Sequence, residues 1–182
     1  ISSIDRPNLS LEVRTGRNRL KAIVEWVEAR PNQRGIVYCL SRKSTEDVAA
    51  GLQKKGIKAK LYHAGMGAKM REKEQQEFIR DDVPIICATI AFGMGIDKSN
   101  IRWVIHYNLP KNIEGYYQEI GRAGRDGLPG DTLLFYSYGD VIQLQRFVDE
   151  SGQPEVGRMK LDRMQQYADA KTCRRRVLLA YF

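Results

Sequence analysis

Short, continuous apolar runs constrain the fold of this chain more than any other feature. Runs without polar alternation are typical of strands in a parallel sheet that is covered on both faces. Helical patterns separate the runs, and such alternation favours an open α/β sheet with right-handed crossovers. The expected strands are Gly35–Leu40, Ala59–His63, Pro84–Thr89, Trp103–Tyr107 and Thr132–Tyr136.

The segments between these strands carry helical signals. One predicted helix has Ser44 or Thr45 as its N-cap, runs to Gln53 and is ended by Gly56. Another spans Lys69–Arg80, where a few apolar residues lie among charges. An earlier helix has one apolar stripe at spacing i, i+3, i+4 and i+7. That stripe consists of Leu20, Ile23, Val24 and Val27.

Beyond the last expected strand the alternation stops. Val141–Val148 and Arg158–Phe182 predict helices with no strand between them, joined by a linker at Glu150–Gly157. We therefore expect an α/β domain at residues 1–149, followed by a short all-helical extension at residues 150–182. The first residue is not methionine and the apolar end has no stop signal, so we expect a fragment of a longer protein.

The net charge indicates the kind of binding partner, and the cysteine content indicates the cellular compartment. The chain has 30 Lys and Arg against 22 Asp and Glu, and its net charge of +8 favours a polyanionic partner. No apolar run is long enough for a membrane span, and no basic-apolar-small pattern marks a signal peptide. The three cysteines are odd in number and far apart, which favours a reducing compartment. Cys39 and Cys87 lie in apolar runs and are expected in the core.

Several common catalytic motifs are missing. The chain has no GxxxxGK[ST] phosphate loop, and Gly93–Gly95 lacks the third glycine of the dinucleotide fingerprint. No acidic pair stands out as a magnesium holder, and neither GxSxG nor HExxH occurs. His106 lies in an apolar strand and is expected as a core residue. His63 ends a strand, where it could either pack or contact a nucleic-acid backbone.

The segment QEIGRAGRDG (Gln118–Gly127) places Arg122 and Arg125 among three glycines. Both arginines could form exposed ion pairs with Glu119 and Asp126, which would contribute little. Alternatively, each guanidinium could bind phosphate oxygens through two parallel hydrogen bonds. An arginine supplied in trans stabilises the charge of a transferring phosphoryl group, and the glycines would give it a mobile mount. The residues by themselves leave both interpretations open.

The motifs together resemble the second motor domain of RecQ DNA helicases. YYQEIGRAGRDG resembles motif VI of superfamily-two helicases, and Ala88–Pro110 resembles motif V in its RecQ form. GIVYCLSR resembles motif IV, and YHAGM (Tyr62–Met66) the segment after it. DRPN (Asp5–Asn8) resembles the start of the RecQ second motor domain, and KTCRRRVLLAYF the start of the zinc-binding region. The resemblance covers essentially the whole chain in order.

This resemblance implies a three-layer RecA-like fold with a mainly parallel sheet, followed by the first helices of a zinc-binding domain. ATP and Mg²⁺ would lie between this domain and a first RecA-like domain, which would carry the missing phosphate loop and acidic motif. The complete enzyme would be an ATP-dependent 3′-to-5′ DNA helicase of replication, recombination and repair. It would be cytoplasmic in a bacterium or nuclear in a eukaryote, and this chain alone would not hydrolyse ATP.

The resemblance also assigns residues to the nucleotide. Arg125 matches the arginine finger on the γ-phosphate, and Arg122 is its neighbour, which contacts phosphate or orders the loop. Asp97 matches a position that meets the ATP ribose, and Gly95 beside it is a second expected cofactor-binding residue. Gln118 would couple the nucleotide to DNA.

A second set matches places where such domains touch single-stranded or forked DNA. Contacts of this kind go mainly to phosphate and sugar, so sequence preference should be low. The expected contacts are Ser41, Arg42, His63, Gly65 and Thr89. Cys173 resembles the first of four zinc ligands, and the other three are expected beyond Phe182. One thiolate cannot build a tetrahedral site, so Zn²⁺ is expected only in the longer protein.

Two other functions remain open at this stage. A non-catalytic nucleic-acid-binding module would use only the basic surface. A DEAD-box RNA helicase would share the fold but act on RNA, although AFGMGIDK and the cysteine-led tail favour the RecQ interpretation.

Overall fold

The computed structural model describes residues 4–89, 92–93 and 96–182. Its centre is a six-stranded sheet in the order β1-β6-β5-β2-β4-β3, and every strand pairing in the described part is parallel. The predicted parallel α/β sheet is therefore confirmed. The strands are β1 (Leu9–Thr15), β2 (Arg34–Tyr38), β3 (Ala59–Tyr62), β4 (Ile85–Ala88), β5 (Ile101–His106) and β6 (Gly130–Tyr136).

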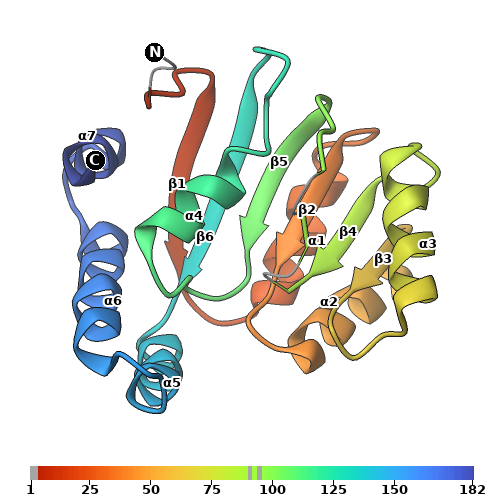
Figure 1. Cartoon of the computed structure of the whole chain (residues 1–182). Coiled ribbons are helices and arrows are strands. Elements are labelled where there is room, and N and C mark those ends of the chain that lie inside the picture. Colours follow the sequence, from red (N-terminus) through yellow and green to blue (C-terminus); the bar gives the residue numbers. More distant parts are fainter. Residues whose placement is uncertain (1–3, 90–91, 94–95) are drawn as a thin grey trace.

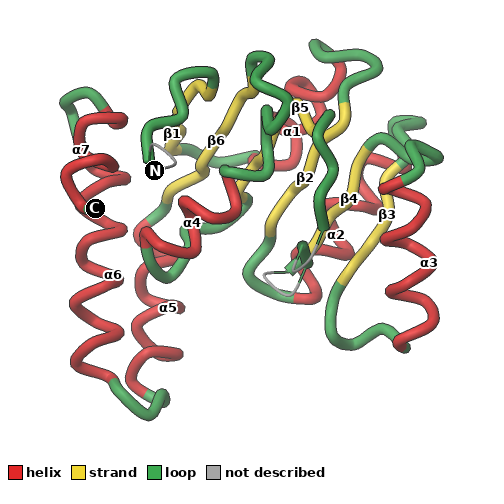
Figure 2. Tube along the Cα trace, turned by 45° about the horizontal axis from the view of Figure 1, so that its top comes forward, coloured by secondary structure: helices red, strands yellow, loops and turns green. Residues whose placement is uncertain are grey.

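Helices cover the sheet on both sides and complete three layers (Figure 1). α1 and α2 pack on one face, while α3 and α4 pack on the other, and α5 to α7 stand beside β1 and β6 (Figure 2). None of the helices that the structure describes is long and apolar enough to span a bilayer. The helices are α1 (Arg19–Glu28), α2 (Arg42–Lys54), α3 (Ala68–Ile79), α4 (Ile113–Ile120), α5 (Tyr138–Asp149), α6 (Pro154–Asp169) and α7 (Arg174–Tyr181).

Strand β1 was not among the expected strands. It is an edge strand that pairs with β6, with Leu9 opposite Gly130 and Thr15 opposite Tyr136. Only Leu9 is buried in it, and the rest of the strand is half-buried or exposed, so it lacks a continuous apolar run. This segment is a strand because it pairs with β6, which lies more than a hundred residues away in the sequence. The local sequence pattern could not predict that pairing.

The start of α2 differs from the sequence expectation. Its N-cap is Ser41, whose hydroxyl accepts a hydrogen bond from the Ser44 amide at 3.1 Å. Thr45 is buried inside the first turn, where its hydroxyl donates to the Ser41 carbonyl at 2.8 Å. Capping by Ser44 or Thr45 was therefore wrong by one turn, because two more hydroxyl residues follow the true cap.

The C-terminal part contains two helices where one was expected from Arg158 to Phe182. α6 starts at Pro154, inside the predicted linker, and ends at Asp169. Proline suits the first turn of a helix, where its missing N–H would have no partner. The chain then turns at residues 170–173 before α7 begins.

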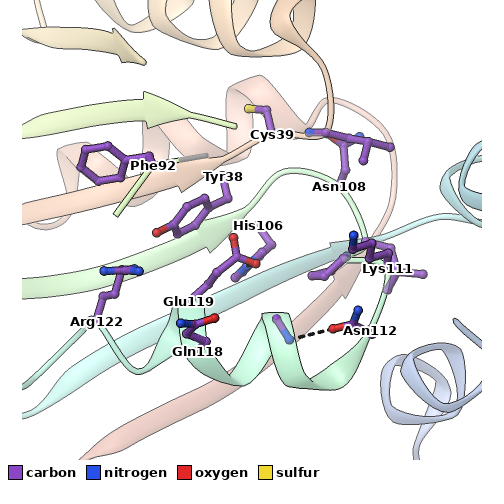
Figure 3. A pocket seen from close by; sticks show the side chains of 14 residues that line it. Tyr38, Cys39, Phe92, His106, Asn108, Lys111, Asn112, Gln118, Glu119 and Arg122 are labelled. Carbon is purple, nitrogen blue, oxygen red and sulfur yellow. Dashed lines mark hydrogen bonds and ion pairs between the residues drawn. The ribbon is translucent and has the colours of Figure 1, made fainter. Parts of the chain in front are cut away.

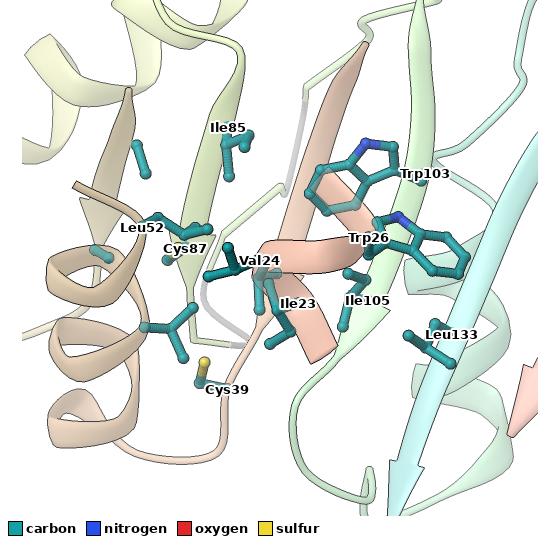
Figure 4. Close-up of a cluster of buried hydrophobic side chains, with 14 of the residues drawn as sticks. Ile23, Val24, Trp26, Cys39, Leu52, Ile85, Cys87, Trp103, Ile105 and Leu133 are labelled. Carbon is teal, nitrogen blue, oxygen red and sulfur yellow. The ribbon is translucent and has the colours of Figure 1, made fainter. Parts of the chain in front are cut away.

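Both tryptophans of the chain lie in the part of the core between the sheet and α1 and α2 (Figure 4). Trp103 of β5 is fully buried there, beside Trp26 of α1. Cys39 and Cys87 are buried in the same cluster, which confirms their predicted core placement. Gly35 of β2 lies under the Trp103 ring, and a Cβ at that position would come within 2.0 Å of it. The glycine therefore makes room for the indole.

We expect Gly35→Ala to lower the free energy of unfolding by about 1–3 kcal/mol or more, because the added methyl group overpacks the core against Trp103. Urea denaturation followed by tryptophan fluorescence measures the change. Gly152→Ala is the matched control, since a Cβ there meets no atom within 4 Å. Equal stability of the two variants would contradict the packing described.

Candidate functional site

The residues expected at DNA follow three neighbouring strands. Ser41 comes after β2, His63 after β3 and Thr89 after β4. The sheet order places β2, β4 and β3 side by side, and the strands are parallel, so the three loops meet at one edge. The Thr89 amide donates to the Tyr62 carbonyl at 3.1 Å, which ties two of the loops together. The structure thus gathers this predicted set along the carboxyl edge.

His63 holds the loop after β3. Its Nδ1 accepts a hydrogen bond from the Gly65 amide at 3.1 Å, so its Nε2 carries the proton that faces Glu46 Oε1 at 3.1 Å. The His63 side chain is buried. Gly65 is exposed, and a Cβ on it would meet Arg42 Nη1 at 3.1 Å. The small residue lets the exposed Arg42 lie across the loop, and a DNA contact for either residue stays a prediction.

The residues expected at the nucleotide lie elsewhere. α4 runs back across the sheet, so the loop after it reaches the start of β5, where the Gly124 amide donates to the Ile101 carbonyl at 2.9 Å. From this loop Arg125 donates to the Ile96 carbonyl at 3.1 Å and contacts Asp97 Oδ1 at 3.2 Å. The Asp97 side chain is 88% exposed. The structure therefore brings Arg125 and Asp97 together and separates them from the DNA set.

Arg122 occupies a buried position beside this pair. Arg122 is 7% exposed, and its guanidinium packs on Gly93. A Cβ at Gly93 would come within 2.4 Å of Arg122 Cζ. Gly93 also has φ of +105°, which favours glycine. The buried Nε of Arg122 has no hydrogen-bond partner in the described part of the chain. A buried donor without a partner costs free energy, so the position is chemically suited to an anion such as a phosphate.

A cavity of about 330 Å³ opens beside Arg122, between α4 and the ends of β2 and β5 (Figure 3). Gln118 and Arg122 are the two predicted residues that line it. The sequence did not predict its other polar members as site residues, because they come from separate elements that only the fold brings together. The cavity is also lined by Tyr38, Phe92, His106, Asn108, Lys111 and Glu119.

His106 is buried, as predicted, but it faces this cavity. Its Nε2 lies 3.4 Å from Glu119 Oε1, while its Nδ1 and Glu119 Oε2 have no partner among the described residues. The ring stacks on Tyr38, whose hydroxyl is also buried without a partner there. Burial raises the pKa of Tyr38, and the nearby charge of Arg122 opposes that rise. The cavity wall is therefore apolar with a few unsatisfied polar groups.

The loop that carries the arginines is held in place, in contrast to the mobile mount expected from its glycines. Gly124 and Gly127 have φ of +61° and +83°, a conformation that favours glycine, whereas Gly121 is helical. Arg6 donates to the carbonyls of Gly121, Ala123 and Gly124 at 3.0, 2.9 and 3.2 Å. Two of the glycines thus serve the turn. The predicted Gly95 lies outside the described residues.

Comparisons with known proteins identify the family. The model "Helicase conserved C-terminal domain" matches residues 18–127, and the model "RecQ zinc-binding" matches residues 138–182. The ATP-dependent DNA helicase RecQ of Haemophilus influenzae is 45% identical over 100% of the chain. This chain is a helicase C-terminal domain of the RecQ family.

Two further comparisons add a viral relative and a solved structure of similar fold. A mimivirus protein named "Putative ATP-dependent RNA helicase R290" is also 45% identical over 100% of the chain. The chain spans 30% of the length of the Haemophilus protein and 34% of the viral one. The DEAD-box protein SrmB of E. coli superposes with a TM-score of 0.67 at 19% identity, over 80% of this chain and 88% of that one, which shows the fold.

The residues matched by the RecQ zinc-binding model include α7. Cys173 is exposed and directly precedes α7, and the backbone amides of Arg176 and Arg175 lower the pKa of its thiol. No group of three or more His, Cys, Asp or Glu that could hold a metal occurs within the described ranges. A single cysteine does not fit a zinc site. The expected zinc ligand and the domain boundary at residue 150 both stay predictions.

We expect Cys173 to react first with iodoacetamide at neutral pH in the native chain, because it is exposed and its pKa is lowered. Burial raises the pKa of Cys39 to about 12 and also raises that of Cys87, so both should react only after unfolding. Mass spectrometry of peptides at increasing reaction times measures the order. Labelling of either buried thiol at the rate of Cys173 would contradict the prediction.

Proposed function

We propose that this chain is the second motor half of an ATP-dependent 3′-to-5′ DNA helicase and that Arg125 is its arginine finger. The observation that carries the proposal is the convergence of Arg122, Arg125 and Asp97 on one face of the sheet, in a chain that has no phosphate loop. Two guanidiniums without a phosphate cradle fit a nucleotide that another domain holds. The chain alone is then inactive as an ATPase.

The partners of Arg125 support this role. Its guanidinium rests on one neutral carbonyl and on the carboxylate of the mostly solvated Asp97, and its side chain is 34% exposed. Exposed ion pairs of this kind contribute little, so a phosphate could displace Asp97 at low cost. The displaced carboxylate would be free to accept a hydrogen bond from the ATP ribose.

The other predicted residues complete the nucleotide side. Arg122 would neutralise phosphate charge from its buried position. Gln118 would couple nucleotide binding to DNA binding. Gly95 precedes Asp97 by two residues in the sequence. A nucleotide phosphate with its Mg²⁺ would be held by the first RecA-like domain, because the residues described in this chain offer no group of acidic ligands for a metal.

The DNA side rests on the carboxyl edge of β2, β4 and β3. Ser41, Arg42 and Thr89 supply hydroxyls and one exposed guanidinium. These groups suit phosphate and sugar contacts with single-stranded or forked DNA rather than base readout. His63 and Gly65 would shape the loop that presents them.

The proposal also covers zinc binding and the cellular compartment of the longer protein. Zn²⁺ would be bound in the longer protein, with Cys173 as one ligand. The enzyme would act in the cytoplasm of a bacterium or in the nucleus of a eukaryote, in DNA replication, recombination and repair.

We expect Arg125→Ala in the full-length protein to lower kcat for ATP hydrolysis by roughly a thousandfold or more, as for other arginine fingers. DNA-stimulated phosphate release measures it. Arg158→Ala is the matched control, because it removes an exposed arginine that is paired with Asp149 on a distant helix. The isolated 182-residue chain should show no turnover. A fully active Arg125→Ala enzyme would favour the non-catalytic binding module instead.

The name of the viral relative keeps RNA open as a second substrate. We expect the full-length protein to unwind forked DNA duplexes and to leave matched RNA duplexes paired. Strand separation of the two substrates, assayed with the same sequence and salt concentration, measures the preference. Faster unwinding of RNA would replace the DNA helicase proposal with an RNA helicase of the same fold.

A further inference from the structure

Arg6, near the start of the chain, binds the loop at residues 121–127 that carries Arg122 and Arg125, called the arginine loop below. It donates three hydrogen bonds to backbone carbonyls at residues 121–124, directly after α4. Carbonyls at the end of a helix lack partners within it, and a cation there is favoured by the helix dipole. Asn8 adds hydrogen bonds to the carbonyls of Gly124 and Leu128, both at 2.9 Å. The backbone course between Arg122 and Arg125 therefore depends on a segment 115 or more residues away.

Arg175 of α7 fastens that segment in turn. It donates to the Arg6 carbonyl at 2.8 Å, to the Leu9 carbonyl, and to Asp5 Oδ1 at 3.1 Å. A guanidinium has five donors in a fixed fork, so one side chain can hold several acceptors at once. The Arg175 side chain is 30% exposed, which leaves its hydrogen bonds partly sheltered from water.

α7 is itself anchored on the α/β domain by independent contacts. Leu178 is buried in the cluster that contains Ile120, the last residue of α4. The Tyr181 hydroxyl donates to Glu114 of α4. Near the start of the chain, the Tyr117 hydroxyl donates to the Ile4 carbonyl at 2.6 Å. The first residues, α4 and α7 therefore form one connected group, visible beside β1 in Figure 2.

We propose that Arg6 and Arg175 are positioning residues for ATP hydrolysis, linking the zinc-binding region to the arginine loop. The zinc-binding family model covers α7, whereas Arg122 and Arg125 lie in the helicase model. Arg175 sets the course of residues 5–9, and Arg6 then sets the carbonyls on either side of Arg122. A displacement of α7 would change where the two arginines point. This inference rests on the proposed role of Arg125.

The test uses the full-length protein with Arg6→Gln and Arg175→Gln. Each should lower kcat for ATP hydrolysis by at least about tenfold, since a misplacement on the order of 1 Å can cost about a hundredfold. KM for ATP should stay unchanged, because a finger acts mainly in the transition state. Arg175→Lys keeps the charge but loses the fork, so it should be intermediate. The matched control Arg176→Gln removes a neighbouring exposed charge and should retain full activity.

Two further measurements separate positioning from general damage. Hydrogen exchange of backbone amides at residues 121–127 should accelerate in both Gln variants, whereas exchange in β5 should stay as in the unmodified protein. Adding Arg6→Gln to Arg125→Ala should cost little more than Arg125→Ala alone, because both changes remove the same contribution. Unchanged exchange at 121–127, acceleration throughout the protein, or fully additive losses would each overturn the inference.

The outcomes distinguish this inference from the function it rests on. An inactive Arg125→Ala enzyme together with fully active Arg6→Gln and Arg175→Gln enzymes would overturn the positioning role alone. A fully active Arg125→Ala enzyme would overturn the arginine finger and with it the catalytic effect of the two positioning residues.

Discussion

The whole arrangement depends on the parallel direction of every described strand pairing in the sheet. Parallel strands cannot be joined by tight turns, so each connection must return from the carboxyl edge to the amino edge. Loops that leave the strands therefore collect at one edge, where the expected DNA contacts lie. Elements that lead back to the amino edge lie on a face of the sheet, and α4 is such an element. One geometric constraint thus separates the two predicted sets of contacts.

The polar groups beneath α4 show a second consequence of this arrangement. Tyr38, His106, Glu119 and Arg122 all have a buried polar atom without a partner among the described residues. Native proteins leave few such groups, because each costs desolvation energy. They lie around the cavity on the face where the nucleotide is proposed to bind. The proposed nucleotide and first motor domain would bring hydrogen-bond partners to this face.

The glycines of the arginine loop suggested a mobile backbone, but the fold holds this backbone with hydrogen bonds from other segments. Glycines at 124 and 127 allow the turn, but Arg6 and Asn8 bind its carbonyls. Catalysis by positioned charge needs donors that do not reorganise during the reaction. A loop held by backbone hydrogen bonds meets that need better than a mobile one. The contacts of Arg175 extend the same support to the region matched by the zinc-binding family.

The sequence alone determined the features that depend on local pattern. Continuous apolar runs predicted five of the six strands, β2 to β6, and their parallel direction, and the buried cysteines followed from the same runs. The tertiary structure decided everything that depends on contacts across the chain. Strand β1 exists because β6 pairs with it, His106 faces a cavity because α4 crosses the sheet, and Arg6 reaches residues 121–124 because β1 lies beside β6. The physical reason is that periodicity records which side of an element is buried, whereas the partner on that side is fixed only when the sheet order brings distant segments together.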